Sequence, residues 1–177
     1  MAEGRVTRKL AAILAGDVVG FSRLMSADEV GALAQVTAHL NEVVRPAVDA
    51  HQGHIFKTMG DGFLAEFASA VEAVECAVRI QRAMAERAGG VAEEHRAIFR
   101  IGINLGDVIV QGDDVFGDGV NVAARIEALA DPGGIFISSS VCDQIVGKCD
   151  FPLEDMGEHK VKNIPKPVHV FRVVTDP

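Results

Sequence analysis

Unbroken apolar runs alternate along this chain with stretches in which apolar residues recur every three or four positions. Residues 10–19 form one such run, which is typical of a central strand buried on both faces of a sheet. Ser26-Ala27-Asp28-Glu29 has the pattern of a capping box, and apolar residues recur at helical spacing through residues 27–50. The first part of the chain therefore predicts a buried strand followed by an amphipathic helix.

The next part of the chain predicts a hairpin and a second helix. Residues 54–58 and 63–67 have strand-like sequences, and the turn between them carries Asp61 near its tip. A second capping box, Ser69 to Glu72, opens a helix that runs to about Arg87.

The second half of the chain predicts shorter elements. We expect a second hairpin, with strands at 98–105 and 108–110 that turn at Gly106-Asp107. A helix over 119–130 ends at a Pro-Gly-Gly stop. The remaining elements are a strand at 135–137, a helix at 139–146, a basic loop at 160–166 and a closing strand at 168–174.

The order of these elements, β-α-β-β-α-β with additions, favours a ferredoxin-like α+β domain with an antiparallel-dominated sheet and helices packed on one face. At 177 residues a single domain is expected, over residues 1–177 with a core at about 8–174. A sheet with one bare face and no Trp or Tyr to cover it favours dimerisation.

Composition and charge narrow the class of protein. Hydrophobic residues make up 49% and charged residues 24% of the chain, as in ordinary globular proteins. The formal charge of −8 argues against nucleic acid or an anionic membrane as a partner. No apolar stretch approaches the roughly 20 residues of a membrane span. The three cysteines form no CxxC pair, which fits a reducing, cytoplasmic location.

The N-terminus offers one alternative reading. Arg5, Arg8 and Lys9 before the apolar run have the pattern of a signal peptide. We favour the buried strand, because the same run leads straight into Asp17.

Two acidic residues follow apolar strands next to glycine. Asp17 ends the first strand shortly before Gly20, and Asp61 lies in the first hairpin. In a ferredoxin-like topology this hairpin lies beside the first strand, so the two carboxylates can meet and hold divalent cations against a phosphate. The alternatives are a local helix cap for Asp17 and a turn residue for Asp61.

Asn121 and Arg125 are four residues apart on a predicted helix, so they lie on the same face. An amide and a guanidinium placed in this way suit a sugar oxygen and a phosphate undergoing substitution. An exposed surface pair gives the same spacing. Lys160, Lys162 and Lys166 are compatible with a triphosphate, and equally with a solvated basic loop.

Together these segments resemble the catalytic domain of the class III nucleotidyl cyclases, from about Arg8 to Val174. Five motifs in the family's order carry the resemblance: Asp17-Val18-Val19-Gly20-Phe21-Ser22, Lys57-Thr58-Met59-Gly60-Asp61-Gly62, Arg100-Ile101-Gly102-Ile103-Asn104-Leu105-Gly106, Phe116-Gly117-Asp118-Gly119-Val120-Asn121-Val122-Ala123-Ala124-Arg125 and Val161-Lys162-Asn163.

The resemblance implies a metal site and a phosphate site. Asp17, the backbone carbonyl of Val18 and Asp61 match the family's ligands for two ions, Mg²⁺ or Mn²⁺, in each active site. The positions whose amides match the phosphate-holding turn are Val19, Gly20, Phe21 and Ser22. Lys162 matches a lysine that contacts the triphosphate.

The resemblance also implies how the nucleoside is read. Lys57 and Asp114 match the pair that recognises adenine. A lysine ammonium only donates and suits adenine N1, whereas a carboxylate only accepts and suits the 6-amino group. Guanine reverses this pattern. Asn121 matches the residue that orients the ribose, and Arg125 matches the residue that stabilises the transition state at the α-phosphate.

In the family the active site lies between two domains packed head to tail, and this chain holds both halves, which implies a symmetric homodimer. The expected reaction converts ATP to 3′,5′-cyclic AMP and pyrophosphate by attack of the ribose 3′-oxygen on the α-phosphorus. The alternatives are a guanylate cyclase, a non-catalytic nucleotide-binding regulatory module, and a diguanylate cyclase, whose Gly-Gly-acidic-acidic-Phe signature the sequence does not contain. Additional regulatory domains beyond residue 177 are compatible with this reading.

Overall fold

The computed structural model describes residues 6–175, without the side chain of Glu94. Its strands are β1 (Val6–Val18), β2 (His54–Met59), β3 (Gly62–Phe67), β4 (Phe99–Gln111), β5 (Asp114–Phe116), β6 (Ile135–Ser138), β7 (Leu153–His159) and β8 (Val168–Val173). Its helices are α1 (Phe21–Ala27), α2 (Glu29–His39), the π-helical segment η1 (Leu40–Val44), α3 (Arg45–Ala50), α4 (Ala70–Ala88), the 3₁₀ turn η2 (Glu93–His95), α5 (Asp118–Leu129) and α6 (Ser139–Ile145).

The strands form one mixed sheet in the order β2-β3-β1-β4-β6-β8-β7, with β5 paired to β4. The pairs are antiparallel except for β4 with β6, which is parallel. The central strand β1 pairs with β3 on one side and, along its whole length, with β4 on the other. The predicted α+β class with an antiparallel-dominated sheet is confirmed.

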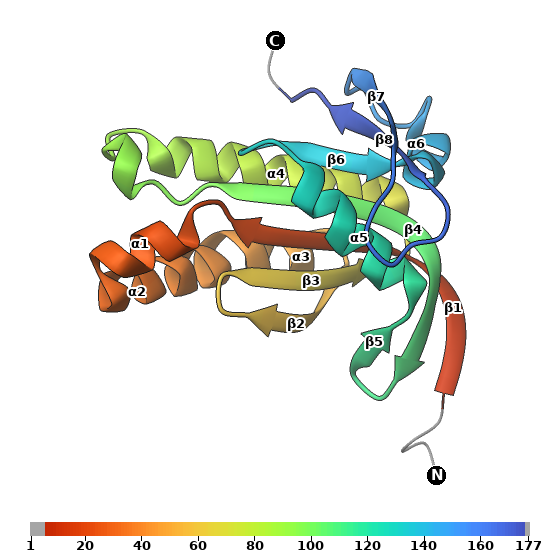
Figure 1. The fold of residues 1–177 in the computed structure, drawn as a ribbon, viewed down its shortest axis with the longest axis horizontal. Helices are drawn as coiled ribbons and strands as arrows, with labels where there is room; N and C mark the ends of the chain where they lie inside the picture. Colours follow the sequence, from red (N-terminus) through yellow and green to blue (C-terminus); the bar gives the residue numbers. More distant parts are fainter. Residues whose placement is uncertain (1–5, 176–177) are drawn as a thin grey trace.

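Helices α2, α3, α4 and α6 cover one face of the sheet, and α5 lies across the other (Figure 1). Successive residues of β1 face these two layers in turn. Leu14 packs in the larger core, whereas Ile13 and Ala15 pack in the core under α5. The expected helix layer on one face is therefore present, and α5 adds a cover on the opposite face. The apolar run of β1 is continuous because both of its faces are buried.

Helix α5 can approach the sheet closely because position 102 carries no side chain. A Cβ atom at Gly102 would lie 2.2 Å from the backbone nitrogen of Glu127 and 2.8 Å from the carbonyl oxygen of Ala123. This contact sets the height of α5 above β4, and with it the positions of Asn121 and Arg125.

Strand β4 differs from the prediction. We expected a hairpin that turns at Gly106-Asp107, but β4 runs without a break from Phe99 to Gln111. Gly106 pairs with Ala11 in the middle of the ladder. A Cβ atom at Gly106 would lie 3.3 Å from the Cα atom of Gly119. This glycine therefore makes room for the start of α5 and does not form a turn.

The helix predicted over residues 27–50 is divided in the structure. Its N-cap is Asp28 and not Ser26, because the Asp28 carboxylate accepts a hydrogen bond from the Gly31 amide at 3.0 Å. The π-helical segment η1 then separates α2 from α3. The second predicted cap is confirmed: Ser69 Oγ accepts a hydrogen bond from the Glu72 amide at 3.3 Å.

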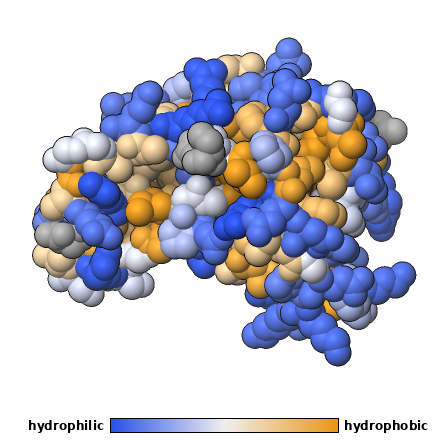
Figure 2. Space-filling model, turned by 90° about the horizontal axis from the view of Figure 1, so that it is seen from above, coloured by the Kyte–Doolittle hydropathy of each residue, from blue (hydrophilic) through white to orange (hydrophobic). Residues whose placement is uncertain are grey.

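The helices and one face of the surface bear on whether the described chain could meet a membrane. Within residues 6–175, no helix combines the length and the hydrophobicity that a bilayer crossing requires. On the face seen in Figure 2, hydrophobic residues occur in small groups with hydrophilic residues between them.

Candidate active site

Asp17 lies one residue before the end of β1, at the edge where the apolar run of the strand meets charged neighbours. Across the ladder its partner is Arg100 of β4. The Arg100 guanidinium donates through Nε to Asp17 Oδ1 at 3.3 Å and through Nη2 to Asp17 Oδ2 at 3.2 Å. This fork neutralises the Asp17 carboxylate.

Asp61 lies beside Asp17 because of the way the β2–β3 turn packs on β1. Gly62 pairs with Asp17 in the sheet, and the carbonyl oxygen of Asp61 accepts a hydrogen bond from the Val18 amide at 3.1 Å. Burial, and then the negative charge of Asp17, raise the pKa of the Asp61 carboxyl. The structure thus brings together the two aspartates that the sequence singles out.

Glu127 of α5 is a third carboxyl in this cluster. Its exposed fraction is only 8%. Burial, followed by the charge of Asp17 and a hydrogen bond with that carboxylate, raises the pKa of Glu127 to about 8. Its Oε2 lies 3.6 Å from Nη2 of Arg100, so this guanidinium forms ion pairs with both Asp17 and Glu127. We call Asp17, Asp61, Glu127 and Arg100 the acidic cluster.

The acidic cluster fits a hard divalent cation. Asp17 and Asp61 present carboxylate oxygens, the ligands that Mg²⁺ and Mn²⁺ prefer. Burial and the nearby charge of Asp17 both disfavour the ionised Asp61 carboxylate, and a bound cation would offset both effects.

The turn after β1 offers backbone amides beside these acids. The Val19 amide is already engaged, since it donates to the Ile98 carbonyl at 2.7 Å. Gly20 adopts a left-handed conformation, with φ of +72°, as the N-cap of α1. The first amides of a helix have no intrahelical acceptor, so those of Phe21 and Ser22 remain able to bind an anion. Of the four predicted phosphate-binding positions, the amide of Val19 is therefore the least available.

Lys57, Asp114 and Asn121 line one hollow of about 670 Å³. Lys57 comes from β2, Asp114 from β5 and Asn121 from α5, so three separate segments converge there. Apolar side chains complete the lining, including Met59, which is 45% exposed, and Phe116, which is 46% exposed. The Lys57 ammonium, the Asp114 carboxylate and the Asn121 amide thus line one hollow together with apolar side chains. We call it the nucleoside hollow, after the ligand that the sequence resemblance implies.

The predicted residues Arg125 and Lys162 lie outside both the acidic cluster and the lining of the nucleoside hollow. Arg125 lies one helical turn beyond Asn121 on α5 and is partly exposed. In the described part of the chain, neither Asn121 nor Arg125 forms a hydrogen bond or ion pair with Asp17 or Asp61. Lys162 is exposed in the turn between β7 and β8, before Asn163, whose φ is +65°.

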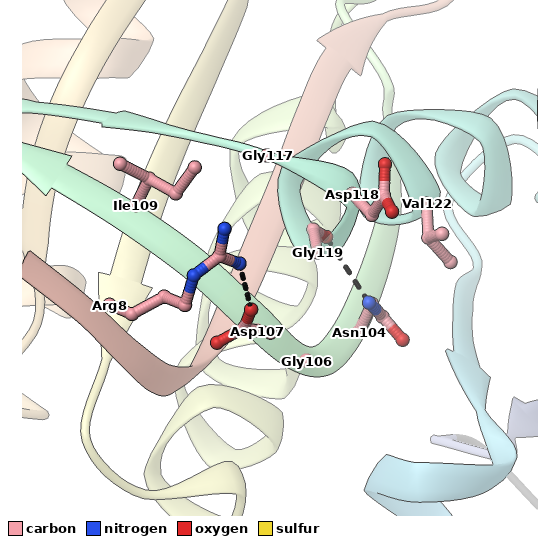
Figure 3. A pocket seen from close by; sticks show the side chains of 9 residues that line it. All are labelled: Arg8, Asn104, Gly106, Asp107, Ile109, Gly117, Asp118, Gly119 and Val122. Atoms are coloured by element: carbon pink, nitrogen blue, oxygen red, sulfur yellow. Dashed lines mark hydrogen bonds and ion pairs between the residues drawn. The ribbon is translucent and has the colours of Figure 1, made fainter.

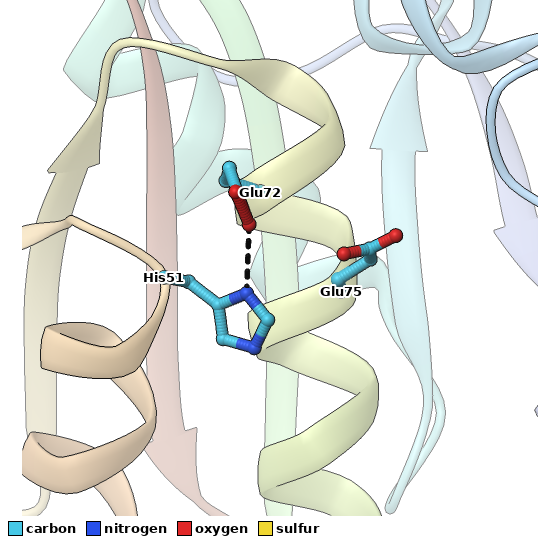
Figure 4. A group of neighbouring side chains, drawn as sticks. All are labelled: His51, Glu72 and Glu75. Carbon is cyan, nitrogen blue, oxygen red and sulfur yellow. Dashed lines mark hydrogen bonds and ion pairs between the residues drawn. The ribbon is translucent and has the colours of Figure 1, made fainter.

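Two other groups of polar side chains lie outside these sites. A hollow at the start of α5 contains the ion pair of Arg8 with Asp107, whose atoms are 2.6 Å apart (Figure 3). His51 Nδ1 lies 2.9 Å from Glu72 Oε1, with Glu75 nearby (Figure 4). This second group is near the end of β3 away from Asp61, so it does not belong to the acidic cluster.

Sequence reasoning missed two members of the acidic cluster, Arg100 and Glu127. Each carries a signal in the sequence. Arg100 interrupts an apolar strand, and Glu127 falls four residues after Ala123 on the buried face of α5. A charged residue at a core position calls for a partner, which only the tertiary structure identifies.

Comparison with known proteins identifies the family to which this domain belongs. The sequence model of the family described as the adenylate and guanylate cyclase catalytic domain matches residues 7–174. The chain belongs to this family, the class III cyclase catalytic domains.

Individual relatives agree with this assignment. The chain is 52% identical to "Putative adenylate cyclase 3" of Rhizobium meliloti, over 97% of this chain and 29% of that protein. A crystal structure described as an adenylate/guanylate cyclase/hydrolase from Silicibacter pomeroyi is 42% identical, with a TM-score of 0.91 over 97% of this chain and all of that one. The adenylyl cyclase CyaB of P. aeruginosa is 26% identical, with a TM-score of 0.84 over 98% of this chain and 97% of that chain.

The chain spans less than a third of the length of its R. meliloti relative and between a third and a half of the length of the other curated relatives it matches. The similarity therefore covers a catalytic domain, and what such longer proteins do as a whole is a separate question.

Proposed function

We propose that this domain is an adenylate cyclase that converts ATP to 3′,5′-cyclic AMP and pyrophosphate. The observation that carries the proposal is the nucleoside hollow, where Lys57 and Asp114 stand together with Asn121. An ammonium donor and a carboxylate acceptor match adenine, which offers an acceptor at N1 and a donor at its amino group.

The proposed site has two parts that a homodimer would combine. One protomer supplies Asp17 and Asp61, and its partner supplies the nucleoside hollow and Arg125. Two features of the single chain support this arrangement. Arg125 forms no hydrogen bond or ion pair with the aspartates of its own chain in the described residues, and Met59 and Phe116 leave apolar surface exposed at the hollow. Exposed apolar surface of this kind favours a partner.

In this proposal each residue positions or stabilises a particular group. Asp17, the Val18 carbonyl and Asp61 hold two Mg²⁺ or Mn²⁺ ions, which supply Lewis acidity toward the 3′-hydroxyl and the phosphates. Asn121 orients the ribose so that its 3′-oxygen lies in line with the α-phosphorus. Arg125 donates to the equatorial oxygens as charge develops on them.

The chain's own amides and lysine hold the leaving group. The amides of Gly20, Phe21 and Ser22, with Val19 in a supporting position, bind the phosphates at the start of α1. Lys162 adds a positive charge to the triphosphate from the β7–β8 turn. The bond from the 3′-oxygen to the α-phosphorus forms as the bond to pyrophosphate breaks.

We also propose where in the cell the domain acts. We assign it to the cytoplasm, because its substrate is ATP and its three cysteines, Cys76, Cys142 and Cys149, are free thiols. We further propose that the residues from about 8 to 174 act as one catalytic domain.

The test is a comparison of kcat/KM for ATP and GTP. The unaltered protein is expected to prefer ATP. A Lys57→Glu/Asp114→Ser variant should lose ATP turnover by at least about a hundredfold and gain relative preference for GTP, because both base contacts are reversed or removed. Asp113→Ser is the matched control, since this neighbour does not line the hollow, and it should keep the ATP preference. Dominant GTP turnover by the unaltered protein would refute the assignment.

A further inference from the structure

A separate hollow of about 220 Å³ lies between α2, the C-terminal half of α4 and the segment that leads into β4. It has room for about seven waters at roughly 30 Å³ each. The residues that matter for its chemistry are Gln35, His39, Met84, Arg87, Val91 and Arg96. Figure 1 shows the end of α4 and the start of the helical region α1–α2 at the same end of the molecule.

His39 is the unusual residue of this hollow. Its exposed fraction is 8%, and its Nδ1 has no hydrogen-bond partner among the described residues. Burial, followed by the charge of Arg87, lowers the pKa of His39, so the ring is a neutral imidazole. An unpaired polar atom in the interior is unfavourable and needs an explanation.

The backbone at His39 is unusual as well. The α-helix changes to the π-helical segment η1 at the next residue, Leu40. Short π-helical segments within α-helices are frequent at functional sites. The unpaired imidazole and the π-helical segment are independent features of the same place.

The lining combines positive charge with apolar surface. Arg96 uses Nε to donate to the Val91 carbonyl at 2.8 Å, and Arg87 has one long contact of 3.5 Å with Glu42. Each guanidinium therefore retains N–H donors for a further acceptor. Met84 and Val91 supply the apolar part.

We infer that this hollow binds a small organic carboxylate, with its anionic end on Arg87 and Arg96 and its apolar body against Met84 and Val91. Guanidinium groups bind carboxylates through charge-assisted and often paired hydrogen bonds. The imidazole of His39 lies on the α2 side of the hollow beside Gln35, whose amide nitrogen already donates to the His95 carbonyl at 2.9 Å.

The hollow is connected to the candidate active site through the start of β4. Arg96 is on its wall, and two residues later Ile98 accepts the hydrogen bond from the Val19 amide. Arg100 then binds Asp17. A carboxylate that fixes Arg96 therefore also acts on the segment that contacts the turn at residues 19–22 and the acidic cluster. The bound carboxylate is thus an effector of the enzyme, a role that rests on the proposed cyclase function.

The binding test uses benzoate, its neutral analogue benzamide and inorganic phosphate, titrated calorimetrically into the Arg125→Ala protein. The titration contains no ATP, so the result does not depend on the proposed function. Benzoate should bind, and benzamide should bind at least about tenfold more weakly. Benzoate affinity should fall at least about tenfold in Arg87→Gln and Arg96→Gln, and remain unchanged in Arg79→Gln, an exposed arginine on the same helix.

Three outcomes would overturn the inference: no benzoate binding at 10 mM, equal binding of benzamide, or equal affinity in the Arg87 and Arg96 variants with native circular dichroism. Phosphate binding tighter than that of benzoate would overturn the assignment to an organic carboxylate. Native circular dichroism of Arg87→Gln and Arg96→Gln checks that a loss of binding does not merely report misfolding.

The effect of benzoate on the cyclase rate is measured separately, on the active protein. Saturating benzoate should change the cyclase rate at least twofold, and in Arg96→Gln the ratio of the rates with and without benzoate should be close to one. An unchanged rate despite measured binding would refute the effector role. Absence of any cyclase activity would count against the proposed function and leave the binding result standing.

Discussion

At the scale of the residue, one guanidinium organises the acidic cluster. Arg100 bridges Asp17 and Glu127, with Nη2 at 3.2 Å and 3.6 Å from their oxygens. Burial, followed by the negative charge of Asp17, raises the pKa values of Asp61 and Glu127, while the single charge of Arg100 acts in the opposite direction. Protonation of the cluster and the proposed binding of a metal would therefore compete.

Arg125→Ala should lower kcat by roughly 10²–10³, about 3–4 kcal/mol, if the guanidinium stabilises charge only in the transition state. KM for ATP should change little. Steady-state kinetics with ATP and Mn²⁺ measures both quantities. Arg79→Ala, an exposed arginine on α4, is the control. Equal losses in the two variants, or a loss confined to KM, would contradict the assigned role.

Glu127 makes the stability of the metal-free protein depend on pH. Burial and the charge of Asp17 raise the pKa of its carboxyl in the folded chain to about 8, from an ordinary value of 4.5. The folded state therefore holds a proton that the unfolded state releases, and the free energy of unfolding falls as pH rises from about 4.5 to 8. The loss should amount to about 3–5 kcal/mol across this window.

Urea unfolding at pH 5 and pH 8 in EDTA measures this effect. In Glu127→Gln the fall should be much smaller, because an amide donates to Asp17 at either pH. Glu86→Gln, at an exposed position of α4, should behave like the unaltered protein. A fall of equal size in Glu127→Gln would show that another group titrates.

At the scale of the element, α5 connects the two parts of the site. Its buried face carries Glu127 into the acidic cluster, and Asn121, one and a half turns earlier, lines the nucleoside hollow. Gly102 on β4 allows the helix to lie close enough for both. Small movements of α5 would therefore affect binding and catalysis together.

Gly102→Ala should destabilise the fold by about 1–3 kcal/mol and reduce activity, since the added methyl group overlaps the backbone of Glu127. Thermal unfolding and cyclase assays measure the two effects. Ile103→Val, at the adjacent buried position, should cost about 0.5–1.5 kcal/mol and retain activity. Full activity in Gly102→Ala would mean that the height of α5 above the sheet does not matter.

At the scale of the whole molecule, Arg125 forms no hydrogen bond or ion pair with Asp17 or Asp61 among the described residues, which is the basis for the proposed dimer. Asp17→Ala and Arg125→Ala should each be inactive alone. Mixed, they should recover up to about a quarter of the unaltered activity, because half of the dimers are mixed and each contains one intact site.

Cyclic AMP formation after mixing measures this recovery, and fluorescence exchange between labelled subunits verifies that mixed dimers form. Mixing two preparations of Arg125→Ala is the matched control and should restore nothing. Demonstrated exchange without recovered activity would disprove a shared site.

Much of the fold follows from local patterns. The hairpin around Asp61, the cap at Ser69 and the α5 helix were predictable because periodicity and turn chemistry act over a few residues. The continuous β4 was not, since Gly106 looks like a turn residue, and its real role is to accommodate Gly119. The break at η1 was not predictable either, because the helical pattern continues through it.

The sequence by itself determined the class of domain and the residue types available for chemistry, because motif order and hydrophobic period are properties of the chain. The tertiary structure alone decided which of those residues meet. Asp17 and Arg100 are 83 positions apart and pair only because β1 and β4 are adjacent. Lys57, Asp114 and Asn121 share a hollow only because three segments converge. Contacts of this kind depend on the packing of distant elements, which no local pattern encodes.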